Sequence, residues 1–227
     1  MKNTHELEDD LRERWLKSYP DDERKAFCFD GLCYNGEIYN DGKNAHQGNE
    51  EKLWNNTDRR ILFLMKDTNN NSDSDYREWH WRNINHNFFN CIFKWLEGLS
   101  RISKDFIPTM ENGDYAAVPN AVVTKYPLAI VNIKKISGTS FVSNKTLYEY
   151  ANRDKAFLQE QIRGILHPNI IVCGGGKGTV LNIAKNIIYE DESFREINYF
   201  CHYSRKLNIL LIDSFHPSAR INSYWKI

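Results

Sequence analysis

The chain has 227 residues, 41% hydrophobic and 26% charged, which is typical of a globular protein. Its 30 basic and 30 acidic residues cancel, so the molecule is no polycation and any nucleic-acid contact must come from a local basic patch. No apolar run is long enough to span a bilayer, the first ten residues are too polar for a secretory signal, and the five scattered cysteines favour a reducing compartment over a disulfide framework. We therefore expect a cytoplasmic, monomeric protein that makes no membrane contact.

We expect one domain over residues 1–227, of which residues 1–57 form a helical and hairpin extension packed on the rest. Apolar residues that recur every four positions predict an amphipathic helix over 4–19, with Trp15 on the packed stripe. The turn signal Asn35-Gly36 predicts a hairpin. The sequence leaves open whether this extension covers a cleft or adds to the core.

Four short apolar runs predict strands that are buried on both faces. These runs are Ile61–Met65, Leu128–Asn132, Asn169–Cys173 and Ile209–Ile212. Helical periodicity predicts helices over 88–99, 146–166 (one helix or a broken pair) and 180–188. Because strands alternate with helices, we expect an α/β fold, a three-layer α/β/α arrangement around a central, mostly parallel four-stranded sheet. Such sheets bind ligands beyond the carboxyl ends of their strands, so a site is expected there.

Polar residues stand at the ends of the first two predicted strands. Asp67 follows the first strand, and its carboxylate is expected to point into a cleft, with a plain turn aspartate as the alternative. Asn132 ends the second strand and carries an amide with both donor and acceptor, although capping of the next segment is its commoner role. Lys134 and Lys135 follow and are interpreted as solvated surface rather than phosphate contacts.

The third predicted strand runs into a glycine-rich turn. Lys177 is followed by Gly178 rather than by Ser or Thr, so the phosphate-loop pattern is not met. A strand-to-helix turn of this kind still lets an anion approach the backbone N–H groups. Close packing of the turn is an equally good interpretation.

The fourth predicted strand runs to the tripeptide His216-Pro217-Ser218. The proline stiffens the turn and fixes the direction of the imidazole. A histidine at a strand end can donate a hydrogen bond to a developing oxyanion, and a structural histidine is the alternative.

In this order the four strand ends resemble those of the uracil-DNA glycosylase superfamily, over about residues 58–222. The family's His-Pro-Ser motif is reproduced letter for letter at 216–218, and its apolar strand that ends in asparagine is matched at 129–132. The family's Gly-Gln-Asp-Pro-Tyr motif is matched at 65–69 in its aspartate alone. Thr68 and Asn69 replace a Pro-Tyr pair whose tyrosine excludes thymine, which leaves the base selectivity open. The four-cysteine iron–sulfur pattern of some branches is missing.

The resemblance implies a DNA glycosylase that flips a nucleotide and hydrolyses the N-glycosidic bond of uracil or a related damaged base, in base excision repair. The expected partner is therefore DNA with a damaged base, and no cofactor or metal is expected. In this interpretation Asp67 and His216 are catalytic. Asp67 stabilises the sugar cation or orients water, and His216 donates to the departing base. Asn132 reads the base edge.

Further DNA contacts follow from the same resemblance. Trp79 and Trp81 are expected to bind the base by stacking, with Tyr76 and Phe88 left open as other candidates. Ala219, Arg220 and Ile221 are expected to enter the groove. The expected contacts to DNA or its phosphates are Gly174, Gly175, Lys177, Ser218 and Arg220.

Two other classes of function remain open from the sequence. Zero net charge and the altered residues after Asp67 also fit a protein that holds a base, nucleotide or nucleic acid without cleaving it. The glycine turn with Lys177 also fits a hydrolase of nucleosides or nucleotides.

Overall fold

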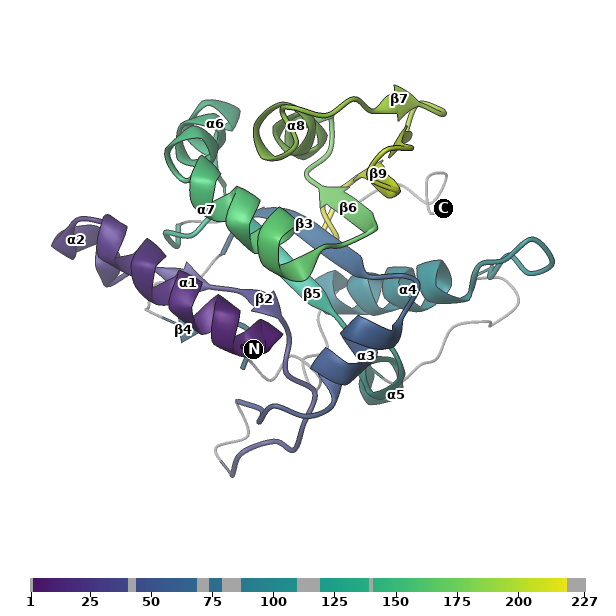
Figure 1. Cartoon of the computed structure of the whole chain (residues 1–227), viewed down its shortest axis with the longest axis horizontal. Coiled ribbons are helices and arrows are strands. Elements are labelled where there is room, and N and C mark those ends of the chain that lie inside the picture. Colours follow the sequence, from purple (N-terminus) through teal and green to yellow (C-terminus); the bar gives the residue numbers. More distant parts are fainter. Residues whose placement is uncertain are drawn as a thin grey trace.

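The computed structural model describes residues 2–40, 44–68, 74–78, 87–109, 119–138 and 141–219. Its centre is a sheet in which the described residues form seven strands (Figure 1). In spatial order these are β2 (Gly31–Leu32), β5 (Ala129–Lys134), β3 (Ile61–Asp67), β6 (Ile170–Gly174), β9 (Ile209–Ser214), β8 (Cys201–Ser204) and β7 (Arg195–Glu196).

The four predicted strands are the four central ones, β5, β3, β6 and β9, and they run parallel. β2 joins one side and β8 and β7 the other, all antiparallel to their neighbours. The prediction of a four-stranded sheet was therefore wrong, because it gave too few strands. The three extra strands are two to four residues long and carry no continuous apolar run, which is why their sequences give no strand signal.

One face of the sheet is covered by α1 (Thr4–Ser18), α6 (Asn144–Arg153), α7 (Lys155–Gln159) and α8 (Thr179–Ile183). The last two continue as π-helical turns, η2 (Glu160–Leu166) and η3 (Ala184–Ile188). Trp15 of α1 stacks on Phe157 with ring centroids 5.3 Å apart. The predicted helix over 146–166 is thus a broken pair, and the N-terminal helix adds to the core of this face.

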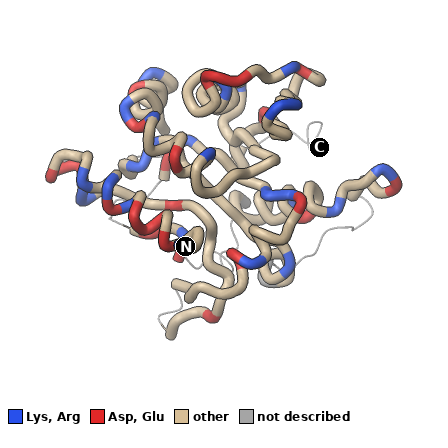
Figure 2. The backbone as a smooth tube through the Cα atoms, in the orientation of Figure 1, with Lys and Arg blue, Asp and Glu red and all other residues tan. Residues whose placement is uncertain are grey.

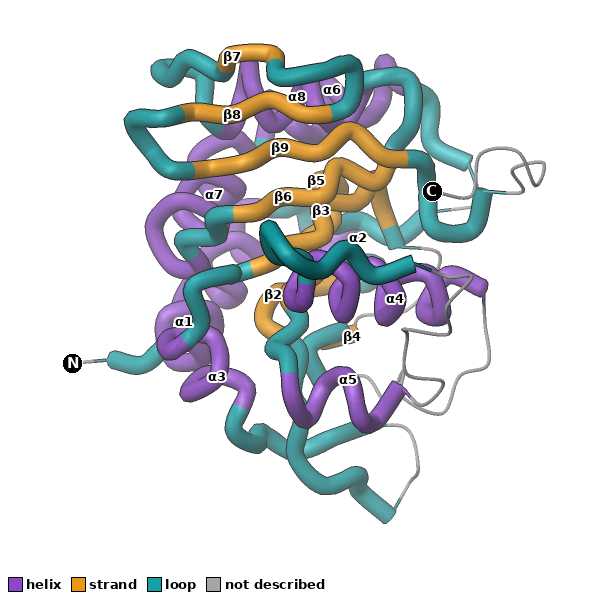
Figure 3. The backbone as a smooth tube through the Cα atoms, turned by 90° about the vertical axis from the view of Figure 1, so that its right-hand side faces the viewer, coloured by secondary structure: helices purple, strands orange, loops and turns teal. Residues whose placement is uncertain are grey.

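The other face is covered by α4 (Asn87–Arg101) and α5 (Pro119–Lys125) (Figure 3). Phe89 and Ile92 of α4 belong to the apolar cluster that contains Phe63 and Met65 of β3. Burying each of these large side chains contributes roughly 1.5–3 kcal/mol. Helices on both faces explain why the central strands are apolar throughout, as predicted.

The remaining elements lie outside the main sheet. They are α2 (Asp21–Arg24), α3 (Glu50–Asn56) and a small parallel pair, β1 (Cys28–Phe29) with β4 (Ser74–Asp75). A hairpin follows β2, in which Ile38 bridges Ala45 and the N–H of Tyr39 donates to the carbonyl of Asn44, so the chain does not reverse at the predicted Asn35-Gly36. No helix among the described residues has the length and apolarity required to cross a membrane.

Candidate active site at the carboxyl edge of the sheet

Asp67 and His216 extend from one edge of the sheet. The register pairs Leu64 with Cys173 and Gly174 with Ser214, so Asp67 and His216 both lie just beyond the level of Gly174. Because β6 separates β3 from β9, the two residues stand about two strand spacings apart, roughly 10 Å. That separation matches the length of a sugar and its base.

Asp67 is the last residue of β3, and its side chain is 13% exposed. Its Oδ2 atom is buried and accepts no hydrogen bond from any described residue, while Nζ of Lys134 lies 3.7 Å from it. Burial raises the pKa of this carboxyl, and the positive charge of Lys134 opposes that rise. A carboxylate held this way has a free lone pair with which to stabilise a cation or accept a proton.

Gly138 lies beside the Asp67–Lys134 pair. Its N–H donates to the carbonyl oxygen of Thr68 over 3.1 Å, which fixes the backbone there. A Cβ on Gly138 would lie 3.1 Å from both Oδ2 of Asp67 and Nζ of Lys134. A side chain at this position would therefore crowd both functional atoms, and glycine leaves them free.

β5 continues past the predicted strand end, so Lys134 takes the place that the sequence assigned to Asn132. Lys134 pairs with Asp67 in the register, whereas Asn132 pairs with Met65, further inside the sheet. Asn132 is 8% exposed, and its side-chain and backbone N–H groups donate to one carboxylate oxygen of Asp30, over 2.9 and 3.0 Å. One donor of the predicted base-reading amide is thus held by Asp30.

Lys134 and Lys135 are both buried, so their interpretation as solvated surface was wrong. The Lys135 ammonium donates to Asp30 and to Gln161 and lies over the ring of Trp15. The Lys134 ammonium donates to the carbonyl of Ile136. Burial lowers the pKa of Lys134, and Asp67 opposes that change.

His216 is held with its Nδ1 atom as an acceptor. The N–H of Ser218 donates to Nδ1 over 3.2 Å, so the neutral ring carries its proton on Nε2. Burial, and then the positive charge of Lys66, lowers the pKa of His216. The ring of Phe88, at the start of α4, lies against the imidazole with centroids 5.4 Å apart. The imidazole therefore presents a neutral N–H donor at this edge.

The glycine turn after β6 is tightly packed. A Cβ on Gly174 would lie 2.4 Å from Sδ of Met65, and one on Gly175 would lie 2.3 Å from Cγ2 of Val180. The N–H of Gly178, at the start of α8, donates to the carboxylate of Asp213 over 3.1 Å. A carboxylate thus occupies the helix start where a phosphate would bind, so the geometry favours the packing interpretation.

The structure describes some of the other residues that are predicted to contact DNA or the base, and the rest lie outside the described part of the chain. Lys177 and Ser218 are exposed at the carboxyl edge of the sheet, as a DNA contact requires. Among the stacking candidates, Phe88 lies against His216, and Tyr76 lies beside β1, where its N–H donates to Phe29. Outside the described residues lie Asn69, Trp79, Trp81, Arg220 and Ile221.

Two exposed aromatic side chains that the sequence reasoning missed lie at the same edge. Phe215, next to His216, is 42% exposed, and Tyr199 is 77% exposed in the turn between β7 and β8. The N–H of Asp213 donates to the carbonyl of Phe200 over 2.7 Å, which ties that turn to the end of β9. The sequence did contain a signal for Phe215, because this aromatic residue stands directly before His216-Pro217-Ser218.

Figure 2 shows basic and acidic residues interspersed along the described chain, as the zero net charge predicts. Positive charge at the carboxyl edge comes from Lys66, beside Gly175 and His216, and from exposed Lys177. The electrostatic attraction available to a polyanion is therefore local.

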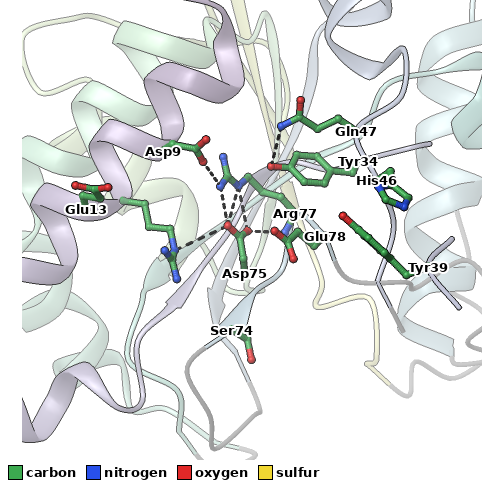
Figure 4. Close-up of a pocket in the computed structure, with 11 residues that line it drawn as sticks. Asp9, Glu13, Tyr34, Tyr39, His46, Gln47, Ser74, Asp75, Arg77 and Glu78 are labelled. Carbon is green, nitrogen blue, oxygen red and sulfur yellow. Dashed lines mark hydrogen bonds and ion pairs between the residues drawn. The ribbon is translucent and has the colours of Figure 1, made fainter. Parts of the chain in front are cut away.

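A separate cavity of about 810 Å³ lies away from this edge, between α1, the hairpin after β2 and the segment that carries β4 (Figure 4). Its two guanidinium groups are already used: Arg77 pairs with Asp9 and Asp75, and Arg12 lies 3.9 Å from Asp75. Tyr39 also lines it. Neither Asp67 nor His216 lines this cavity, so the cavity and the strand-end residues suggest two different places for a functional site. We place the candidate site at the strand ends because the Asp67–Lys134 pair and an oriented imidazole lie there.

Comparison of the sequence with protein-family models and with curated proteins finds no match. Among the described residues, no group of three or more His, Cys, Asp or Glu side chains is placed to hold a metal ion.

Proposed function

We propose that this protein is a DNA glycosylase that hydrolyses the N-glycosidic bond of uracil or a related damaged base, and that its fold is the three-layer arrangement of the uracil-DNA glycosylase superfamily. One observation carries the proposal. Asp67 and His216, far apart in the sequence, extend from the same edge of the parallel sheet, on either side of β6.

The reaction asks for two charges to be stabilised at once. As the bond between sugar and base lengthens, the sugar becomes cationic and the base becomes anionic. Asp67 supports the first change because its Oδ2 accepts no hydrogen bond from a described residue, so its carboxylate can stabilise the cation or accept a proton from water. His216 supports the second because its neutral ring offers the Nε2 proton to a carbonyl oxygen of the base.

The base-reading role stays a prediction for Asn132. Its amide is on β5, next to Met65 of β3 in the register, so a base that reaches it must pass Lys134 and Asp67 at the ends of these two strands. Asp30 fixes the amide orientation by accepting its N–H. A fixed amide discriminates between donor and acceptor patterns more sharply than a free one.

The direct test is base excision. The protein is incubated with single- and double-stranded oligonucleotides that contain one uracil, and the products are treated with alkali, which cleaves at abasic sites. We expect cleavage at the uracil position, lost in Asp67→Ala. The matched control is Asp105→Ala, because Asp105 is exposed in the loop after α4. Intact strands with the unaltered protein on both substrates would remove uracil excision, and a panel of other damaged bases would then test the remaining reaction class.

A further inference from the structure

A buried lysine lies beside the candidate catalytic carboxylate, and the glycosylase step does not use it. Lys134 is 9% exposed as a side chain, its Nζ lies 3.7 Å from Oδ2 of Asp67, and the ring of Tyr150 lies 5.2 Å from the same nitrogen. Lysines are seldom buried because the ammonium loses its hydration. A lysine kept at this position therefore calls for a role.

Lys134 and Asp67 lie side by side on neighbouring strands. Any sugar whose C1′ atom comes within reach of Asp67 also comes close to Nζ of Lys134, since reacting atoms approach to roughly 3–3.5 Å. Gly138, beside both atoms, has no side chain that would crowd them. A substrate that reaches one of these two groups therefore also meets the other.

We propose that Lys134 is a nucleophile toward the aldehyde of an abasic deoxyribose, and that the protein cleaves DNA strands at abasic sites as a lyase. This inference rests on the proposed function, because an abasic sugar is what base excision leaves behind. Lysine amines form Schiff bases with carbonyl groups when desolvation keeps them neutral. Burial lowers the pKa of Lys134 in this direction.

The atoms balance as follows. Neutral Nζ adds to C1′ of the ring-opened sugar, and the aldehyde oxygen leaves as water with one proton from the amine and one from solvent, which gives an iminium ion. Asp67 takes a proton from C2′, the electron pair forms the C2′–C3′ double bond, and the C3′–O bond breaks with the 3′ phosphate as the leaving group. Water then hydrolyses the imine, which returns Lys134 and releases an unsaturated aldehyde.

Borohydride trapping tests the proposal on the full chain. Sodium borohydride supplies a hydride that reduces the iminium ion to a stable amine, so the protein becomes linked to a labelled oligonucleotide that contains a preformed abasic site. We expect a covalent adduct, with peptide mapping placing the link on Lys134. A tetrahydrofuran abasic analogue has no aldehyde and must give no adduct.

Variants separate Lys134 from other lysines. Lys134→Met is expected to lower the adduct yield at least tenfold, whereas Lys104→Met, which removes an exposed lysine in the loop after α4, keeps it. Because Lys134→Met removes a buried partner of Asp67, Lys134→Arg serves as a second variant that keeps the positive charge and still cannot form the imine. Mapping of the link in the unaltered protein needs no variant.

The outcomes distinguish this inference from the proposed function. The preformed abasic site requires no excision, so an adduct at Lys134 without uracil release supports the lyase and counts against the glycosylase. Uracil release without an adduct overturns the lyase alone. An adduct of equal yield in Lys134→Arg, or a link mapped to another amine, also overturns it.

Discussion

The backbone N–H of Ser218 donates to Nδ1 of His216 over 3.2 Å, and this contact determines which ring nitrogen carries the proton. A backbone N–H can only donate, so Nδ1 must be unprotonated. We expect nitrogen NMR to show His216 as the tautomer with the proton on Nε2 at neutral pH. Detection of the proton on Nδ1 would contradict the assigned role of the ring.

The same contact gives a pH dependence for excision. Protonation of Nδ1 breaks the bond from Ser218, so activity requires the neutral ring. Burial and Lys66 lower the pKa of His216 below its ordinary 6.5, so activity should persist as the pH falls past 6.5 and decline only in more acid solution. Lys66→Met removes a positive charge, which favours the imidazolium and should move the decline to higher pH. An unchanged profile in Lys66→Met would argue against this coupling.

Asp67→Asn should separate activity from stability. Burial raises the pKa of Asp67, so its contribution to stability is present at low pH and is lost as the pH rises through the pKa of the folded state. At neutral pH, replacing the carboxylate by the neutral amide should therefore not lower the free energy of unfolding, and the melting temperature should stay equal or rise. Excision should fall about 10²–10⁴-fold, because the amide cannot act as a base. A clear drop in melting temperature would show instead that the ion pair with Lys134 stabilises the fold.

The sequence predicted the elements that hold Asp67 and His216 because both follow short apolar runs, and such runs must be buried. The parallel sheet then brings their ends to one edge, whatever the intervening 148 positions contain. Phe88 also lies as the helical periodicity of α4 requires, with its neighbours Phe89 and Ile92 in the core.

Contacts between distant segments could not be predicted from local patterns. Lys134 and Lys135 look like surface residues in sequence, yet one pairs with Asp67 and the other with Asp30, 105 residues away. Asp30 itself stands in a turn signal, Asp30-Gly31, where a solvated aspartate is the usual expectation. Burial of such charges depends on partners that local periodicity does not reveal.

The buried pair Asp30–Lys135 should be sensitive to single substitutions. Asp30 is 1% exposed and Lys135 is fully buried, so Lys135→Met leaves an unpaired buried carboxylate, as Asp30→Asn leaves an unpaired ammonium. We expect each single variant to lose about 3–5 kcal/mol in chemical denaturation. The double variant Asp30→Asn/Lys135→Met should lose less than the sum of the two. Additive losses would mean that the two side chains do not interact energetically.

Phe215 and Tyr199 provide the last prediction, which concerns DNA binding without cleavage. Exposed rings near His216 can stack on the bases of an unpaired strand, and each such contact is worth about 1–3 kcal/mol. Phe215→Ala and Tyr199→Ala should each weaken binding of an undamaged single-stranded oligonucleotide about tenfold, measured by fluorescence anisotropy at low salt. Ile107→Ala is the matched control, because Ile107 is 68% exposed beyond the far end of α4. Affinities unchanged in both aromatic variants would mean that the strand follows another path across the protein, and equal losses in Ile107→Ala would show that the effect is not specific to the carboxyl edge.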